Sequence, residues 1–262
     1  MFSWIFYLSF FMFWCFCFKI MNIFVALVLG FWISIFLSLI LVFVVLGLCM
    51  LFIRKLEPNH VWKHKIVLSI SKFIIRFFRI NVKVHNPRFI PLKGKMVVYA
   101  NHKTNFDPFI IASIFPRTLT FTPKDVLYKG LKGLFLGFCF DATDCVKISR
   151  GNNRETVKNF MRMIHKIQQN LSILIFHEGG VTTTYTDKII HSLDGAFQIS
   201  LKSQANILPI TLKGVYAIRG KCWFRKKQVE IFFHPIIPFM ELKSKNTQQI
   251  NQQVTDIINS VL

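Results

Sequence analysis

His102 and Asp107 stand five residues apart in the segment Asn101-His-Lys-Thr-Asn-Phe-Asp-Pro108. On a continuous α-helix they would lie about 140° apart around the axis, so they can meet only if a turn follows His102 and a helix begins at Asp107. Pro108 supports this arrangement, because proline favours the first helical position. An aspartate that accepts a hydrogen bond from Nδ1–H fixes the tautomer, leaves Nε2 as a base and stabilises the imidazolium. The pair therefore predicts general-base chemistry; the alternative is a helix cap beside a loop histidine.

Two further polar groups follow short apolar runs. Arg150 comes after residues 146–148, and Glu178 and Gly179 come after residues 173–176. An arginine presents a planar fork that suits phosphate, whereas a glutamate flanked by glycines can approach a hydroxyl or orient the arginine. The alternatives are a surface salt bridge and a glycine-rich turn.

The elements that must position these residues alternate along the chain from residue 81 onward. Alternating strands and helices predict an α/β fold, a single domain over residues 56–262 with a central, mostly parallel or mixed sheet flanked by helices. In such sheets ligand groups gather beyond the carboxyl ends of strands. The predicted strands are 82–84, 96–100, 119–122, 146–149, 173–176, 207–212 and 229–233, and the predicted helices are 108–115, 154–169, about 193–203 and 247–262.

No residue pattern calls for a metal or a resident cofactor. The six cysteines form no C-x-x-C pair, and we expect them to be reduced. Gly130, Gly133 and Gly137 match no nucleotide-binding loop, so we interpret them as turn or packing glycines. A metal-dependent hydrolase would have to use His102, Asp107, His177 and Glu178, but no compact H-x-x-x-H or H-E-x-x-H spacing exists.

Charge divides the chain into two unequal parts. The protein has 33 Lys and Arg against 12 Asp and Glu, a net charge of +21, yet Lys19 is the only charged residue among residues 1–53. A helix needs roughly 20 apolar residues to cross a bilayer. Residues 1–55 therefore predict an uncleaved membrane anchor of one or two hydrophobic helices, with a bend near Gly30. A secretory signal is excluded because there is no basic start and no cleavage site after Phe18.

Basic residues crowd the stretch that follows the anchor. Residues 54–95 contain eleven Lys and Arg and one acid, Glu57, which places the body on the cytoplasmic side of a cell membrane. Within this stretch, residues 61–80 predict an amphipathic helix that either lies on an anionic lipid surface or packs its apolar side on the core. A nucleic acid is not expected as partner, because no recognition motif accompanies the charge.

The ordered set of motifs resembles the glycerolipid acyltransferases, specifically the 1-acyl-sn-glycerol-3-phosphate acyltransferases of the bacterial PlsC type. The matching blocks, within roughly residues 80–220, are His102-x4-Asp107, Lys124-Asp-Val-Leu127, Val146-Lys-Ile-Ser-Arg150, Phe176-His-Glu-Gly179 and Ile207-Leu-Pro-Ile210.

The resemblance implies transfer of an acyl group from a thioester, acyl-CoA or an acyl carrier protein, to the free hydroxyl of an anionic lysophospholipid among membrane lipids. His102 and Asp107 would then be catalytic. Arg150, Lys124, Glu178 and Gly179 would bind the substrate.

The third block departs from the family pattern. His177 stands where the family has proline, Gly180 where it has threonine, and Val181 where it has arginine. Arg150 is therefore expected to carry more of the phosphate contact, together with Lys103 or Lys124. Two other functions stay open: acylation of glycerol 3-phosphate or another lysophospholipid, and a non-enzymatic membrane-anchored basic protein that binds lipid.

Overall fold

Side chains of strand β2 (Met96–Ala100) point alternately into two hydrophobic clusters. Met96, Val98 and Ala100 belong to the first cluster, whereas Val97 and Tyr99 belong to the second. Successive side chains of a strand point to opposite faces of its sheet, and all five are buried here. The sheet is therefore covered on both faces, as parallel strands generally are.

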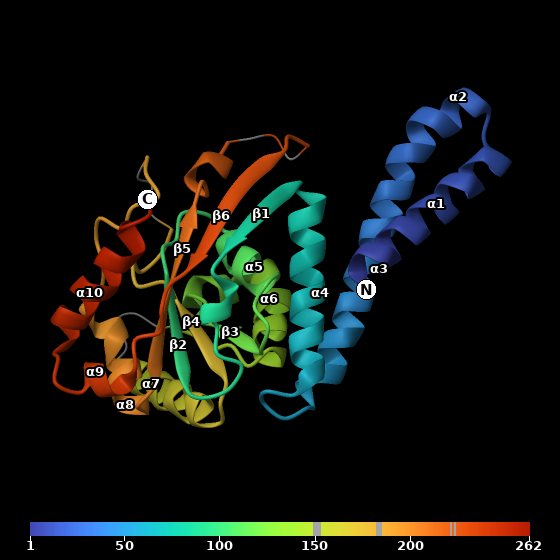
Figure 1. Cartoon of the computed structure of the whole chain (residues 1–262). Coiled ribbons are helices and arrows are strands. Elements are labelled where there is room, and N and C mark those ends of the chain that lie inside the picture. The colour runs from blue at the N-terminus through green and yellow to red at the C-terminus, as the bar shows by residue number, and fades with distance from the viewer. Residues whose placement is uncertain (149–152, 182–184, 221, 223) are drawn as a thin grey trace.

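A computed structural model of the chain describes residues 1–148, 153–181, 185–220, 222 and 224–262 (Figure 1). In these residues, six strands form one sheet in the order β1-β6-β5-β2-β4-β3. Neighbouring strands are parallel except for β5 and β6, so the predicted α/β fold with a mixed sheet is confirmed. The other strands are β1 (Ile80–His85), β3 (Leu119–Phe121), β4 (Ser172–Ile175), β5 (Asn206–Lys213) and β6 (Lys227–Phe233).

Helices cover the two faces of the sheet unequally. The first cluster includes residues of α5, and the second includes residues of α7, α8 and α10. The body's helices are α4 (Val61–Phe77), α5 (Asp107–Ala112), α6 (Gly130–Ala142), α7 (Asn153–Gln168), α8 (Gln198–Ser203), α9 (Phe239–Leu242) and α10 (Thr247–Asn259), with 3₁₀ turns η2 (Pro87–Phe89), η3 (Asp125–Tyr128), η4 (Asp194–Phe197) and η5 (Tyr216–Ile218).

The strand predicted at residues 146–149 is wrong within the described residues. There, only a single parallel bridge forms, between Lys124 and Ile148, and Ser149 lies outside the described part of the chain. Val146 is nevertheless buried, and its backbone N–H donates to the carbonyl of Phe121. The bridge still brings the end of this run beside Lys124.

Helix α6 was not predicted because its sequence contains three glycines, which disfavour a helix interior. The structure shows what Gly133 and Gly137 do. A Cβ on Gly133 would collide with the backbone carbonyl of Tyr128, and one on Gly137 would lie 2.9 Å from the Tyr128 ring. Both are therefore packing glycines, as the sequence suggested, and they let η3 lie directly on α6.

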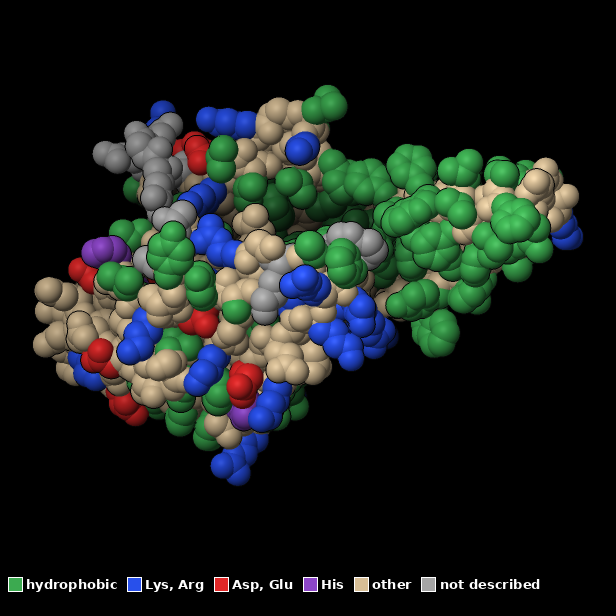
Figure 2. Space-filling view, turned by 90° about the horizontal axis from the view of Figure 1, so that it is seen from above, with side chains coloured by type: hydrophobic (Ala, Val, Ile, Leu, Met, Phe, Trp, Pro, Cys, Tyr) green, Lys and Arg blue, Asp and Glu red, His purple; other side chains and the backbone are tan. Residues whose placement is uncertain are grey.

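The first 54 residues form a helical hairpin that extends away from the body (Figure 1). It consists of α1 (Phe2–Ile20), the short α2 (Ile23–Val25), a π-helical segment (Ala26–Gly30) and α3 (Phe31–Arg54). The irregular segment lies where a bend near Gly30 was expected, and a Cβ on Gly30 would be 2.9 Å from that of Cys17. Both long helices are apolar and long enough to span a membrane, and most of their side chains are exposed. Figure 2 shows this apolar surface against the Lys- and Arg-studded body.

Helix α4 packs its apolar side on protein. Ile66 and Phe73 are buried in a cluster with Phe2, Val42 and Ile53 of the hairpin. Residues 61–80 were expected either to lie on a lipid surface or to pack on the core. The apolar face of α4 packs on protein, as in the second arrangement. Lys65, Lys72 and Arg76 remain exposed on the other side of the helix.

Gly133→Ala should lower the free energy of unfolding by about 1–3 kcal/mol, because the new methyl overpacks a backbone contact that cannot yield. Helix propensity alone would favour the alanine. The matched control is Gly195→Ala, where a Cβ meets nothing within 4 Å. Denaturant titration of both variants in detergent measures the difference, and equal stability of the two would contradict the role given to Gly133.

Candidate active site

The segment between β2 and α5 forms the turn expected from the sequence. Strand β2 ends at Ala100, and α5 begins at Asp107 with Pro108 in its first turn. His102 Nδ1 lies 2.9 Å from Asp107 Oδ2, so the expected hydrogen bond is present. Asp107 is fully buried, whereas the side chain of His102 keeps 14% of its surface exposed.

Asp107 holds the turn as well as the histidine. Its Oδ2 accepts the backbone N–H groups of Lys103 at 2.7 Å and Thr104 at 2.8 Å, and its Oδ1 accepts the Thr104 hydroxyl at 2.5 Å. These donors precede Asp107 in the chain, so the carboxylate does not act as a helix N-cap. A buried carboxylate with this many donors has a fixed orientation, and the histidine ring is fixed with it.

Glu178 supports the same loop from the end of β4. Its Oε1 accepts the backbone N–H of His102 at 2.7 Å, and its Oε2 pairs with the Lys103 ammonium. Both side chains are 1% exposed. Lys103 was expected to help hold a phosphate; this expectation is corrected, because its ammonium is buried against Glu178. These contacts make Glu178 a residue that positions the backbone of His102.

The imidazole of His102 lies flat on the ring of Phe176, with centroids 4.0 Å apart and planes at 14°. Its Nδ1 is engaged by Asp107. No hydrogen bond within the described part of the chain engages Nε2. Asp107 and Phe176 therefore fix the orientation of the ring, and Nε2 is the nitrogen left open to a substrate.

Charged side chains are buried next to the ring. Asp107 is fully buried, and the side chains of Lys103 and Glu178 form a buried ion pair. The carboxylate of Asp107 is in direct contact with Nδ1 of His102, so it lies where it would stabilise a positive charge on the ring during a reaction.

Asn101 and Asp187 fix the surrounding loops. The Asn101 amide donates to the carbonyls of Asp187 and Leu212 and accepts the N–H of Leu212. The Asp187 carboxylate accepts the N–H groups of Gly214 at 2.6 Å and Tyr216 at 2.7 Å. The segments after β2 and β5 are thereby tied together next to His102.

The described part of the chain includes the predicted substrate-binding residues Lys124, Glu178 and Gly179. Arg150 lies outside the described residues. Lys124 is exposed, and its Nζ occupies the space that a Cβ on Gly180 would fill. Gly179 and Gly180 have φ of 75° and 149°, so the turn after Glu178 requires conformations that side chains disfavour. The threonine-to-glycine departure at residue 180 thus makes room for Lys124 beside the Glu178 turn.

His177 does not join His102. Its ring is fully buried and packs edge-on against Tyr99 and Phe197, within the second cluster. Burial lowers the pKa of His177 from 6.5 to about 4. Nε2 lies 3.3 Å from the Thr255 hydroxyl, and Nδ1 has no hydrogen-bond partner among the residues that the structure describes. Within the described residues, no group of three or more His, Cys, Asp or Glu side chains gathers where a metal ion could bind.

Sequence reasoning did not identify Thr104, Phe176 or the Lys103–Glu178 pair as parts of the site. Thr104 has no spacing signal of its own, and Phe176 resembles an ordinary strand residue. A lysine in a loop is usually exposed, so nothing in the sequence indicated that Lys103 is buried.

Comparisons with known proteins converge on one family. The sequence model of the family described as Acyltransferase matches residues 81–213. A probable 1-acyl-sn-glycerol-3-phosphate acyltransferase of Mycoplasma pneumoniae is 30% identical over 180 residues, 64% of this chain and 66% of that protein. Its counterpart of the same name in Mycoplasma genitalium is 32% identical over 136 residues, 52% of this chain and 50% of the relative. The matches thus span about half to two thirds of these relatives.

The fold also has a solved counterpart. The crystal structure of the 1-acyl-sn-glycerophosphate (LPA) acyltransferase PlsC from Thermotoga maritima superposes with a TM-score of 0.63 at 20% identity, covering 81% of this chain and 85% of that one. At this identity the likeness shows the fold.

His177→Phe should flatten the loss of stability in acid. A buried histidine with a pKa of about 4 stays neutral in the folded state, whereas the unfolded chain binds a proton below about pH 6.5. The folded state therefore loses stability as the pH falls from 6.5 towards 4, by about 2 kcal/mol between pH 7 and pH 4.5. Denaturant titration of the wild type and the variant at both pH values measures this; parallel losses in the two proteins would contradict it.

Proposed function

The chain belongs to the acyltransferase family, and from this premise we propose that it transfers a fatty acyl group from a thioester to the free hydroxyl of 1-acylglycerol 3-phosphate, which gives phosphatidic acid. The observation that supports this reaction best is the His102–Asp107 hydrogen bond at the carboxyl end of β2, with Nε2 of His102 uncommitted. A thioester is already activated, so the group that the protein must supply is a base for the alcohol.

The reaction needs one proton transfer in each direction. Nε2 of His102 takes the hydroxyl proton as the alcohol oxygen bonds to the thioester carbonyl carbon. The C–S bond then breaks, and the leaving thiolate takes the proton back from the imidazolium. The carboxylate of Asp107 stabilises the imidazolium between these steps. The proposed reaction uses no acyl-enzyme, metal or resident cofactor.

The remaining residues hold and position the substrate. Glu178 and Lys103 fix the backbone of His102 and act through it. Arg150 and Lys124 are proposed to bind the phosphate of the acceptor, and Gly179 leaves space for its glycerol. Lys124 qualifies because its exposed ammonium lies against the turn that begins at Glu178. Glycerol 3-phosphate or another lysophospholipid would fit the same chemistry as acceptor.

The membrane is proposed to bind the apolar hairpin and helix α6. Phe135 of α6 stacks on Phe43 of α3 with centroids 4.2 Å apart, so α6 packs against the hairpin. Leu131 and Leu134 of α6 are 88% and 72% exposed. Exposed leucines beside apolar helices fit burial in lipid. The body is proposed to lie on the cytoplasmic side, a proposal supported by the excess of Lys and Arg in residues 54–95.

His102→Ala should lower kcat for lysophosphatidate acylation by roughly 10² to 10⁴, the usual contribution of a general base. The matched control is His191→Ala, which removes an exposed histidine outside the site. Membranes that contain equal amounts of each protein are assayed with labelled acyl-CoA or acyl carrier protein against a panel of lysolipids. Undiminished acylation by the His102 variant would refute the mechanism. Liposome binding by the wild type with no transfer from either donor would favour the non-enzymatic lipid-binding alternative.

Leu131→Asp combined with Leu134→Asp should reduce acylation of lysophosphatidate presented in vesicles, because α6 no longer enters the lipid. Activity on detergent-dispersed acceptor should be retained. Leu92→Asp, at a leucine that is 70% exposed elsewhere on the body, serves as control. If the α6 variant acts on vesicles as well as the Leu92 variant does, α6 does not contact the membrane.

A further inference from the structure

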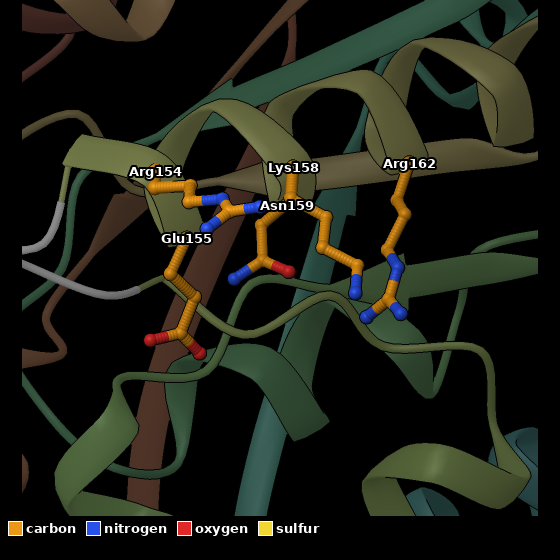
Figure 3. A pocket seen from close by; sticks show the side chains of 5 residues that line it. All are labelled: Arg154, Glu155, Lys158, Asn159 and Arg162. Atoms are coloured by element: carbon orange, nitrogen blue, oxygen red, sulfur yellow. The ribbon is translucent and has the colours of Figure 1, made fainter.

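Helix α7 carries a row of three cations on one face. Arg154, Lys158 and Arg162 are spaced by four residues, so they share one face of the helix, and Figure 3 shows the three side chains extending from the same side. All three are exposed. In the part of the chain that the structure describes, none of them has an ion-pair partner. The neighbouring carboxylate, Glu155, forms its ion pair with Lys147 at 2.7 Å.

This arrangement is unfavourable for the isolated helix. Like charges four residues apart repel each other, and a cation in the first turn opposes the positive end of the helix dipole. Arg154 stands in that first turn, directly after Asn153. An anion bound along the row would reverse both effects.

Asn159 supplies an independent sign of a ligand. It lines the same pocket as the three cations and Glu155, whose carboxylate pairs with Lys147. Figure 3 shows the Asn159 amide on the same side of the helix as the neighbouring side chains. The residue is 5% exposed, and its Nδ2 has no hydrogen-bond partner among the described residues. A buried amide donor left unpaired costs about 1–3 kcal/mol. An oxygen-rich anion in the pocket would satisfy it.

The row begins close to the proposed catalytic site and leads away from it. Lys124 lies against the Glu178 turn and bridges Ile148, and Lys147 pairs with Glu155 at the start of α7. From Arg154 to Arg162 the helix rises roughly 12 Å. The phosphate of a glycerol phosphate acceptor must stay near His102. A row of this length instead suits the acyl donor, whose phosphates are separated from its thioester by a long pantetheine arm.

We propose that Arg154, Lys158, Asn159 and Arg162 bind the phosphate-bearing end of the phosphopantetheine carrier that delivers the acyl group. The inference rests on the proposed function, since it assigns the donor of that reaction to α7. Coenzyme A and the holo form of an acyl carrier protein share this phosphate chemistry, and the experiment separates them.

The test measures binding of coenzyme A alone, and of holo acyl carrier protein alone, to the full chain in detergent. Lys158→Glu should raise the Kd of the donor carrier about tenfold, because it removes a charge-assisted contact and adds repulsion. Lys243→Glu reverses an exposed lysine after α9 and should leave the Kd unchanged. Weakened binding of coenzyme A identifies that carrier as the ligand, and weakened binding of the carrier protein alone identifies the protein.

Asn159→Leu provides a second readout. It removes a buried, unpaired polar group, so the variant should be at least as stable as the wild type, while the Kd should still rise several-fold. A purely structural Asn159 would change stability and not binding. If neither Lys158→Glu nor Asn159→Leu changes either Kd beyond the Lys243 control, the α7 site is refuted. Because binding is read without turnover, weakened binding in a chain that shows no acyl transfer would support the α7 site and count against the proposed reaction alone.

Discussion

The buried carboxylate of Asp107 is the constraint on which the site depends. It has no contact with solvent and must therefore be fully hydrogen-bonded. The groups that satisfy it are the ring of His102 and the backbone and hydroxyl donors of residues 103 and 104. One interaction thus sets both the shape of the turn and the orientation of the imidazole.

The pairing of the strands brings two further charged side chains, Glu178 and Lys103, next to His102. Because β2 and β4 are parallel neighbours, their carboxyl ends lie side by side. Glu178, which follows β4, therefore accepts a hydrogen bond from the backbone N–H of His102. A buried glutamate needs a partner, and Lys103 provides it. The Lys103–Glu178 pair and Asp107 thus hold the backbone and the ring of His102 from two sides. The apolar hairpin, whose two long helices could span a membrane, packs through α4 against the same body.

Much of this arrangement could be predicted from the sequence, and the exceptions have physical reasons. The period of apolar residues indicated the strands, and Pro108 together with the His102–Asp107 spacing indicated the turn. Helix α6 was missed because its glycines serve a tertiary contact with Tyr128 that no local propensity reports. Lys103 was misassigned to a phosphate because only the fold reveals that it is buried with Glu178. Residues 146–149 were predicted to form a strand, but strand pairing depends on neighbours that sequence periodicity does not specify.

The most direct test of the central claim is the tautomer of His102. In the full chain labelled with ¹⁵N at histidine, with His102→Asn used to assign the signals, the two ring nitrogens can be observed at a pH where the ring is neutral. Asp107 should hold the proton on Nδ1, so Nε2 should appear unprotonated and available as the base. A neutral ring with its proton on Nε2 would contradict general-base catalysis by His102.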